Sequence, residues 1–277
     1  MSKRIGIVGV SSILGPGLEA ETLRIAREVY PQDTPELVFA PTRAPSGHFN
    51  ASDDERAADF LAFANDPALD AVWFARGGYG SGRLIERILD GLEPASRDKD
   101  YLGYSDAGSL LAALYTEGYP RLAHGPMPYD AMIYDKTGES VRRGLRWLVD
   151  RDPAALEAAV DGVTPTAAFN IVILANLAGT PWMPDLSGHI LILEEIKEEM
   201  YRIDRHLFQL AYNPFIRNVK EVRLGRWDIK ENVPDFAMTD EALIRYWCER
   251  IGVPYGGRAE VGHYEANKVV PFGVYPA

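Results

Sequence analysis

The chain has 277 residues, a formal net charge of −11 at pH 7 and a hydrophobic content of 47%. This length and composition are those of a folded globular protein with one large or two modest domains. The acidic excess excludes a surface built for nucleic acid or an anionic membrane, because such surfaces need clustered Lys and Arg. A single cysteine, Cys248, excludes an intrachain disulfide and favours a reducing compartment.

The first apolar run, residues 5–10, follows Lys3 and Arg4, as the apolar core of a signal peptide would. The run is short, β-branched and interrupted by glycine, and no convincing small-residue cleavage site accompanies it. We therefore interpret it as a buried first strand. No stretch approaches the ~18 apolar residues that span a bilayer, so we expect a cytoplasmic protein with no membrane partner.

Strand-like and helix-like segments alternate through the first half of the chain. The expected strands are residues 5–10, 37–40, 71–75, 101–104 and 122–124. The expected helices are residues 17–30, 53–65, 107–115 and a segment ending at 92, and a capping box of Ser52 and Glu55 is expected to begin the second of them. Such alternation predicts a doubly wound, mainly parallel α/β sheet, whose ligands bind at the carboxyl ends of its strands.

The second half changes character, and we place a domain boundary between about residues 150 and 166. The expected elements are helices at 141–149 and 153–160, a strand at 189–193, a helix at 200–212, a strand at 219–227, a helix at 240–250 and a tail of strands and turns. The predicted organisation is a first domain at 1–150, a linker at 151–165 and a second domain at 166–277.

The segment YLGYSDAGSL, residues 101–110, places Ser105 and Asp106 in a turn between a buried strand and a helix. A serine there faces the crevice above the sheet, and the first N–H groups of the helix point at the group that it attacks. Ser105 is therefore a candidate nucleophile. The alternative is that Ser105 or Asp106 serves only as the helix N-cap.

The glycine-rich loop RGGYGSG, residues 76–82, follows the third expected strand. Its spacing fits neither a dinucleotide-binding fingerprint nor a phosphate-binding loop. Glycines at a strand end still expose backbone N–H groups to a bound oxyanion. A tight turn that lets the next helix pack closely is an equally open interpretation.

The candidate bases and acids lie in the remaining segments. None of the five histidines has a metal-binding spacing to another, so no metal site is predicted. His206 is expected to be solvated and His189 to lie in a turn, which leaves His263 and His124 as candidate bases. Glu194 ends an apolar strand, where burial demands an imidazole or arginine partner.

Taken together, several segments resemble the LD-carboxypeptidases, a serine peptidase family that includes murein tetrapeptide carboxypeptidases and microcin C self-immunity peptidases. The matching segments are RGGYGSGRL at 76–84, GYSD at 103–106, HGPM at 124–127, LAGTPWMPDLSGHILILEE at 177–195, YRIDRHLFQL at 201–210, VGH at 261–263 and VPFG at 270–273. The resemblance implies a nucleophile at Ser105, an acid at Glu194, a base at His263, and neither cofactor nor metal.

The resemblance also implies an α/β amino-terminal domain carrying the serine and a smaller β-rich carboxyl-terminal domain carrying the glutamate and histidine. The active site would lie in the cleft between them, with an oxyanion hole formed by the N–H groups of Gly78 and Asp106. The implied substrate is a small murein peptide, cut at the L,D amide bond between meso-diaminopimelate and a terminal D-alanine. The candidate substrate-binding residues are Arg76, Tyr79, Asn170 and Arg202.

Two departures from the family pattern bear on the substrate. Gly108 stands where relatives often have Thr, and Phe169 precedes Asn170 where relatives often have glycine, which leads us to expect a narrowed pocket. A peptidase that cleaves an aminoacyl-nucleotide conjugate stays open as an alternative, as does a non-catalytic ligand-binding protein on the same fold. An α/β-hydrolase esterase and a nucleotide-binding oxidoreductase both fail on glycine spacing. The sequence leaves a homodimer open.

Overall fold

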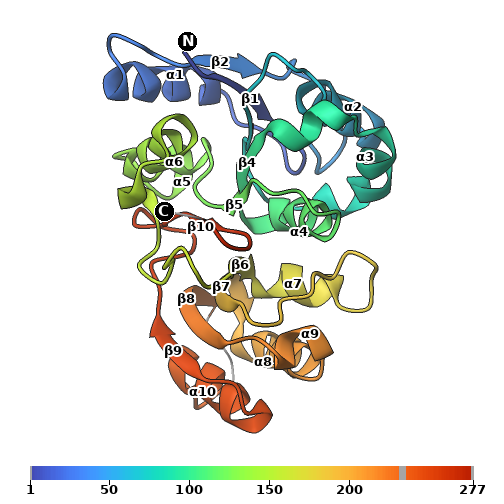
Figure 1. The fold of residues 1–277 in the computed structure, drawn as a ribbon, viewed down its shortest axis with the longest axis vertical. Coiled ribbons are helices and arrows are strands. Elements are labelled where there is room, and N and C mark those ends of the chain that lie inside the picture. The colour runs from blue at the N-terminus through green and yellow to red at the C-terminus, as the bar shows by residue number, and fades with distance from the viewer. Residues whose placement is uncertain (1, 231–234, 276–277) are drawn as a thin grey trace.

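The structure is a computed structural model that describes residues 2–230 and 235–275 of the chain. Two sheets organise it, one formed mainly by the first half of the chain and one by the second half (Figure 1). The first half fills the upper part of that view and the second half the lower part. Among the described residues, no helix combines the length and apolar character that crossing a lipid bilayer requires.

The first sheet has six strands in the order β10-β5-β4-β3-β1-β2. Its strands are β1 (Arg4–Val8), β2 (Glu36–Phe39), β3 (Ala71–Phe74), β4 (Asp100–Gly103), β5 (Leu122–His124) and β10 (Val270–Pro271). The first five pair in parallel, and β10 pairs antiparallel with β5. The mainly parallel sheet predicted from the alternation is therefore confirmed, with one antiparallel strand added from the carboxyl-terminal tail.

Helices cover both faces of this sheet because its strands are apolar on both sides. In β3, Val72 and Phe74 pack on the side of the second, third and fourth helices, whereas Trp73 packs on the side of the first and sixth. A capping box at Ser52 and Glu55 begins the second helix as predicted. The helices are α1 (Leu18–Val29), α2 (Asp53–Ala64), α3 (Ile85–Gly91), α4 (Gly108–Thr116), α5 (Asp130–Ile133) and α6 (Glu139–Asp150).

The second sheet has four parallel strands in the order β6-β7-β8-β9. They are β6 (Thr166–Asn170), β7 (Ile190–Glu199), β8 (Glu221–Lys230) and β9 (Tyr255–Arg258). The accompanying helices are α7 (Ile171–Leu177), α8 (Met200–Ala211), α9 (Pro214–Arg217) and α10 (Asp240–Ile251). The second half is therefore a smaller unit in which four helices accompany a parallel sheet of four strands.

The linker region departs from the sequence interpretation. A helix at 153–160 was expected, but the chain forms only a single 3-10 turn, η4 (Pro153–Ala155), begun by the Asp152 side chain. After that turn Leu156 pairs with Val269 as an isolated bridge, so backbone pairing with the tail replaces further helix. The predicted boundaries at 150 and 166 stay a prediction, although β10 places part of the tail in the first sheet.

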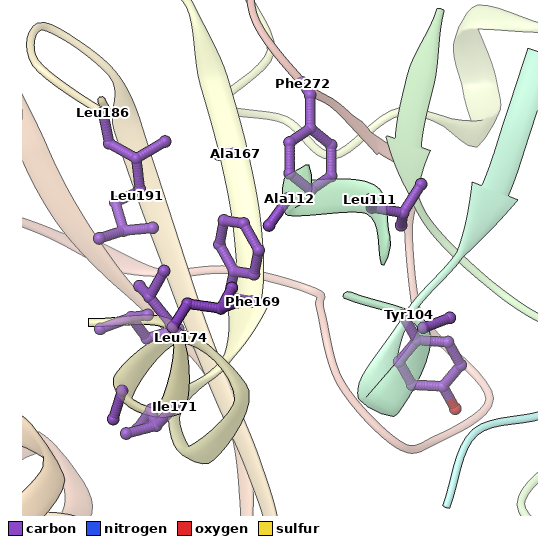
Figure 2. Packing of buried hydrophobic residues seen from close by; sticks show 14 of the residues in the cluster. Tyr104, Leu111, Ala112, Ala167, Phe169, Ile171, Leu174, Leu186, Leu191 and Phe272 are labelled. Carbon is purple, nitrogen blue, oxygen red and sulfur yellow. The ribbon is translucent and has the colours of Figure 1, made fainter. Parts of the chain in front are cut away.

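One apolar core joins the two halves. Phe169 of β6 and Phe272, which follows β10, meet edge to face with ring centroids 5.2 Å apart. Figure 2 shows these rings beside Leu111 and Ala112 of α4. Phe169 is 1% exposed and belongs to this core. It does not line the cavity that contains Ser105, so the expectation that it narrows a substrate pocket is wrong.

We expect Phe169→Ala to lower the free energy of unfolding by about 3–5 kcal/mol, because it removes a buried ring from the junction of the two halves. Chemical denaturation followed by circular dichroism measures this change. Phe208→Ala is the matched control, because Phe208 is 55% exposed, and it should cost less than about 1 kcal/mol. Equal losses in the two variants would contradict the assignment of Phe169 to a joining core.

Candidate active site

Ser105 lies in a strained turn at the carboxyl end of a central strand. It begins the 3-10 turn η3 (Ser105–Ala107), which separates β4 from α4. Its φ of 58° falls in the left-handed region, which costs a non-glycine residue about 1–2 kcal/mol. Such a turn lifts the hydroxyl above the sheet, and strain of this kind persists only where the surroundings enforce it.

The carboxylate of Asp106 enforces that turn. Its Oδ2 accepts hydrogen bonds from the Ser11 hydroxyl at 2.5 Å and the Ser81 N–H at 2.8 Å. Its Oδ1 accepts one from the Gly80 N–H at 3.2 Å. Asp106 is 3% exposed, so these bonds compensate for its lost hydration. The buried side chain thereby joins the loops after β1 and β3 to the serine turn, a role other than helix capping, since the N-cap residue of α4 is Ala107.

The glycine loop lies so close to Ser105 that a side chain at Gly77 would clash with the serine. A Cβ at Gly77 would lie 2.7 Å from the Ser105 Oγ, and one at Gly78 would lie 2.1 Å from the Ser12 Oγ. Gly78 also has a φ of 117°, which L side chains rarely adopt. Within the described residues the Gly78 N–H makes no hydrogen bond to protein. It is therefore available to a ligand.

Glu194 and His263 form the second part of the site. Glu194 lies on β7 with no exposed surface, and its Oε2 is 2.8 Å from the Nδ1 of His263. The neighbouring strand allows this burial through Gly225, where a Cβ would lie 3.0 Å from the Glu194 Cβ. The carboxylate thus finds the imidazole partner that its burial demands, and His124 is not that partner.

Burial and charge act in opposite directions on His263. Burial alone would lower the pKa of its imidazole, but the Glu194 carboxylate and its hydrogen bond outweigh that effect, so the pKa is raised above the ordinary value. Two aromatic rings also hold the imidazole, those of Tyr104 at 4.7 Å and Tyr134 at 5.2 Å between centroids. The ring orientation is therefore fixed from two sides and by one hydrogen bond.

A further carboxyl group, Asp130, supports the same cluster. It accepts hydrogen bonds from the Tyr104 hydroxyl and the Met127 N–H, each at 2.9 Å. Burial raises the pKa of Asp130 to about 7. Tyr104 in turn contacts His263, and the charge of Asp130 also contributes directly to the raised pKa of the imidazole. Sequence reasoning missed both residues, although an aspartate within the apolar run after HGPM was a signal for a buried polar contact.

A cavity of about 240 Å³ brings the two parts together. Ser105 and His263 both line it, and the remaining lining comes from both halves of the chain. Apart from these two, its polar lining consists of Arg76, Tyr104, Tyr129, Asp130, Tyr134 and Lys197. A hydroxyl, an imidazole with a buried carboxylate partner, and free backbone N–H groups therefore border one space. This set can activate a nucleophile and hold an oxyanion.

Arg76 is the one of the four candidate substrate-binding residues that lines this cavity. Its guanidinium lies 4.1 Å above the Tyr129 ring and donates a hydrogen bond to the Ile13 carbonyl. Tyr79 is 57% exposed and packs beside Phe49. The structure therefore places Arg76 at the cavity and Tyr79 on the outer side of the glycine loop.

Asn170 and Arg202 lie elsewhere. The Asn170 Nδ2 donates to the Glu195 Oε1 at 2.7 Å, and the other Glu195 oxygen accepts from the Val172 N–H at 3.0 Å. Burial, with a smaller contribution from neighbouring Glu194, raises the pKa of Glu195 to about 7. Arg202 lies on α8 and pairs with Glu199 at 3.0 Å. Asn170 and Glu195 thus fix β7 against α7.

The other histidines have different surroundings. His124 is 2% exposed, and burial lowers its pKa to about 4. It does not line the cavity. His189 bonds to the Tyr115 hydroxyl at 2.8 Å, and His206 is half-buried on α8. Within the described residues, no group of three or more His, Cys, Asp or Glu side chains is placed to hold a metal ion.

Comparisons with known proteins agree with this architecture. Residues 5–125 match the LD-carboxypeptidase N-terminal domain, and residues 165–275 match the LD-carboxypeptidase C-terminal domain. A Streptomyces coelicolor protein named as a carboxypeptidase is 34% identical over 80% of this chain and 73% of its own length. The murein tetrapeptide carboxypeptidase of Pseudomonas aeruginosa is 28% identical over 79% of this chain and 76% of its own length.

Solved structures share the fold. The muramoyltetrapeptide carboxypeptidase of Oxalobacter formigenes superposes with a TM-score of 0.78 at 24% identity, covering 97% of this chain and 93% of that one. A microcin self-immunity protein gives a TM-score of 0.78 at 16% identity, covering 99% of this chain and 92% of that one. From the two matched domains and the identity to its relatives, the chain belongs to the LD-carboxypeptidase family.

Proposed function

We propose that this chain is a serine-type carboxypeptidase that hydrolyses the L,D amide bond between meso-diaminopimelate and the terminal D-alanine of murein tetrapeptides. The observation that carries the proposal is the buried Glu194–His263 pair beside the cavity that Ser105 lines. The names of its relatives support the murein peptide as substrate. In this role the enzyme would recycle cell-wall peptides.

The reaction begins with the Ser105 hydroxyl. The Nδ1–H of His263 donates to Glu194, which leaves Nε2 as the basic nitrogen. This nitrogen takes the Ser105 proton as the oxygen attacks the scissile carbonyl. The same imidazolium then gives its proton to the departing amine of D-alanine, and an acyl-enzyme remains. Water, activated by the same imidazole, hydrolyses that ester and restores the serine.

The oxyanion of each tetrahedral intermediate is held by the N–H groups of Gly78 and Asp106. Gly78 lines the cavity and its N–H is free of protein partners in the described structure. Asp106 is the second residue of the turn that begins at Ser105, where N–H groups lack helical partners. Loss of one such donor typically costs about 10²–10³ in turnover.

Replacing the nucleophile tests the proposal directly. Purified protein should release D-alanine from a murein tetrapeptide but not from the pentapeptide, and Ser105→Ala should lower that rate by about 10⁴-fold or more. Mass spectrometry of the products measures both results, and circular dichroism checks that the variant is folded.

Three results would contradict this assignment. Undiminished release by Ser105→Ala would exclude the serine as nucleophile. Cleavage of an aminoacyl-nucleotide conjugate, with the tetrapeptide left intact, would instead favour the alternative substrate. Intact peptide and conjugate after incubation with folded protein would favour a ligand-binding protein.

The Glu194 carboxylate raises the pKa of His263, so its removal leaves burial as the dominant effect. We expect Glu194→Gln to lower the pKa of His263 and to move the acidic limb of kcat/KM to lower pH. Turnover should fall at the same time, by as much as about 10⁴-fold, because the imidazole loses its orienting partner. Titration by NMR measures the pKa, and an unchanged value would show that Glu194 does not control the imidazole.

Gly77→Ala tests the close approach of the glycine loop to the serine. The added Cβ would lie 2.7 Å from the Ser105 Oγ, so the hydroxyl must move, and we expect kcat/KM to fall by about 10²-fold. Gly82→Ala is the matched control in the same loop, because its Cβ would meet nothing closer than Ser109 at 3.8 Å. Peptide hydrolysis by both variants measures the difference, and similar rates would contradict the proposed geometry.

A further inference from the structure

Lys197 occupies an unusual backbone position close to the catalytic carboxylate. It is the extra residue of a bulge in β7, where Ile196 pairs with Asp228 and Glu198 pairs with the next residue of β8, Ile229. Its φ of 60° lies in the left-handed region, where glycine would avoid the steric penalty of a side chain. Bulges turn a side chain away from the regular alternation of a strand, and they are frequent beside active sites.

This bulge places a lysine side chain at the cavity. Lys197 lines the same space as Ser105 and His263, three residues after Glu194 on the same strand. A strained residue at such a place calls for a functional explanation, because a glycine would form the bulge at lower cost. The functional explanation is therefore to be sought in the lysine side chain and not in the backbone conformation.

The ammonium group of Lys197 is available to bind a ligand. In the described part of the chain it takes part in no ion pair or hydrogen bond, although the protein carries a net charge of −11. The adjacent Glu198 and Glu199 instead lie beside Arg202, at 4.0 and 3.0 Å. The other cation that lines the cavity, Arg76, already stacks on Tyr129 and donates to the Ile13 carbonyl.

We infer that Lys197 binds the free terminal carboxylate of the substrate and thereby makes the enzyme select a chain end. This inference rests on the proposed function, since a carboxypeptidase must distinguish a terminal residue from an internal one. A lysine ammonium offers a compact charge and three donors, and a charge-assisted bond to a carboxylate is stronger than a neutral one. Placing it on the strand of Glu194 fixes its position relative to the imidazole.

Two carboxylates flank the scissile bond of a murein tetrapeptide and have the required chemistry. One is the terminal carboxylate of D-alanine, and the other belongs to the meso-diaminopimelate side chain. The inference commits to the terminal carboxylate, because selection of the chain end depends on that group. Substrates that lack one carboxylate at a time therefore distinguish the two sources.

The test is a cycle of two proteins and three peptides. The wild type and Lys197→Met are each given the tetrapeptide, its carboxyl-terminal amide, and a tetrapeptide with lysine in place of diaminopimelate. We expect the variant to lose about 10- to 100-fold in kcat/KM with the two peptides that keep the terminal carboxylate. With the amide, wild type and variant should have similarly low rates.

Control variants separate charge from folding. Lys197→Gly removes the ammonium while favouring the left-handed backbone, so it should show the same loss of kcat/KM without a loss of stability. Lys197→Arg should keep part of the activity. Lys136→Met removes an exposed lysine that does not line the cavity, and its kcat/KM should equal that of the wild type.

Two other results would overturn the pairing of Lys197 with the terminal carboxylate. An equal loss with the amide means that Lys197 does not pair with the terminal carboxylate. A loss that disappears with the lysine-containing peptide assigns the bond to diaminopimelate instead.

Binding to Ser105→Ala separates the inference from the proposed function. Calorimetry with the tetrapeptide and its amide measures the preference for a carboxylate without any hydrolysis. If the wild type releases no D-alanine but Ser105→Ala prefers the free acid only when Lys197 is present, the proposed reaction fails and the inference stands. If the tetrapeptide is neither bound nor hydrolysed, both fail.

Discussion

The burial of Glu194 is the constraint on which the site depends. A carboxylate with no exposed surface is costly unless a partner compensates for its lost hydration, and His263 supplies that partner at 2.8 Å. Because His263 lies beyond β9, the pairing fixes the tail of the chain against β7. Gly225 permits the approach on the neighbouring strand, and Tyr104 contacts the imidazole from the other half. Burial of this one carboxylate thus brings together residues from four distant segments, including its own.

Much of the fold could be predicted from the sequence because the patterns that indicate its strands and helices are local. The alternation of apolar runs identified the parallel sheet, and the capping box at Ser52 marked the start of α2. The helix expected at 153–160 was wrong because Val269 competes for the backbone of that segment, and no local pattern reports such a distant pairing. The same limit explains why the arrival of β10 in the first sheet was not expected.

The candidate site, too, could be predicted from the sequence only in part. The motifs around Ser105, Glu194 and His263 were recognisable because each is a contiguous run of residues. Their supporting contacts were not, because Asp106 binds Ser11 across 95 positions and Asp130 binds Tyr104 across 26 positions. Lys197 was missed for a different reason. Its significance lies in a left-handed φ at a bulge, which depends on the pairing of two strands.

The antiparallel strand β10 has a consequence for how the protein is made. The first sheet consists of β1 to β5 from the first 124 residues, but its edge beside β5 stays open until residues 270 and 271 have been synthesised. His263 is synthesised only shortly before residues 270 and 271. Until then the sheet has an open edge that could pair with another chain, and Glu194 lacks its imidazole partner. The proposed site of Ser105, Glu194 and His263 is therefore complete only after the tail has been synthesised.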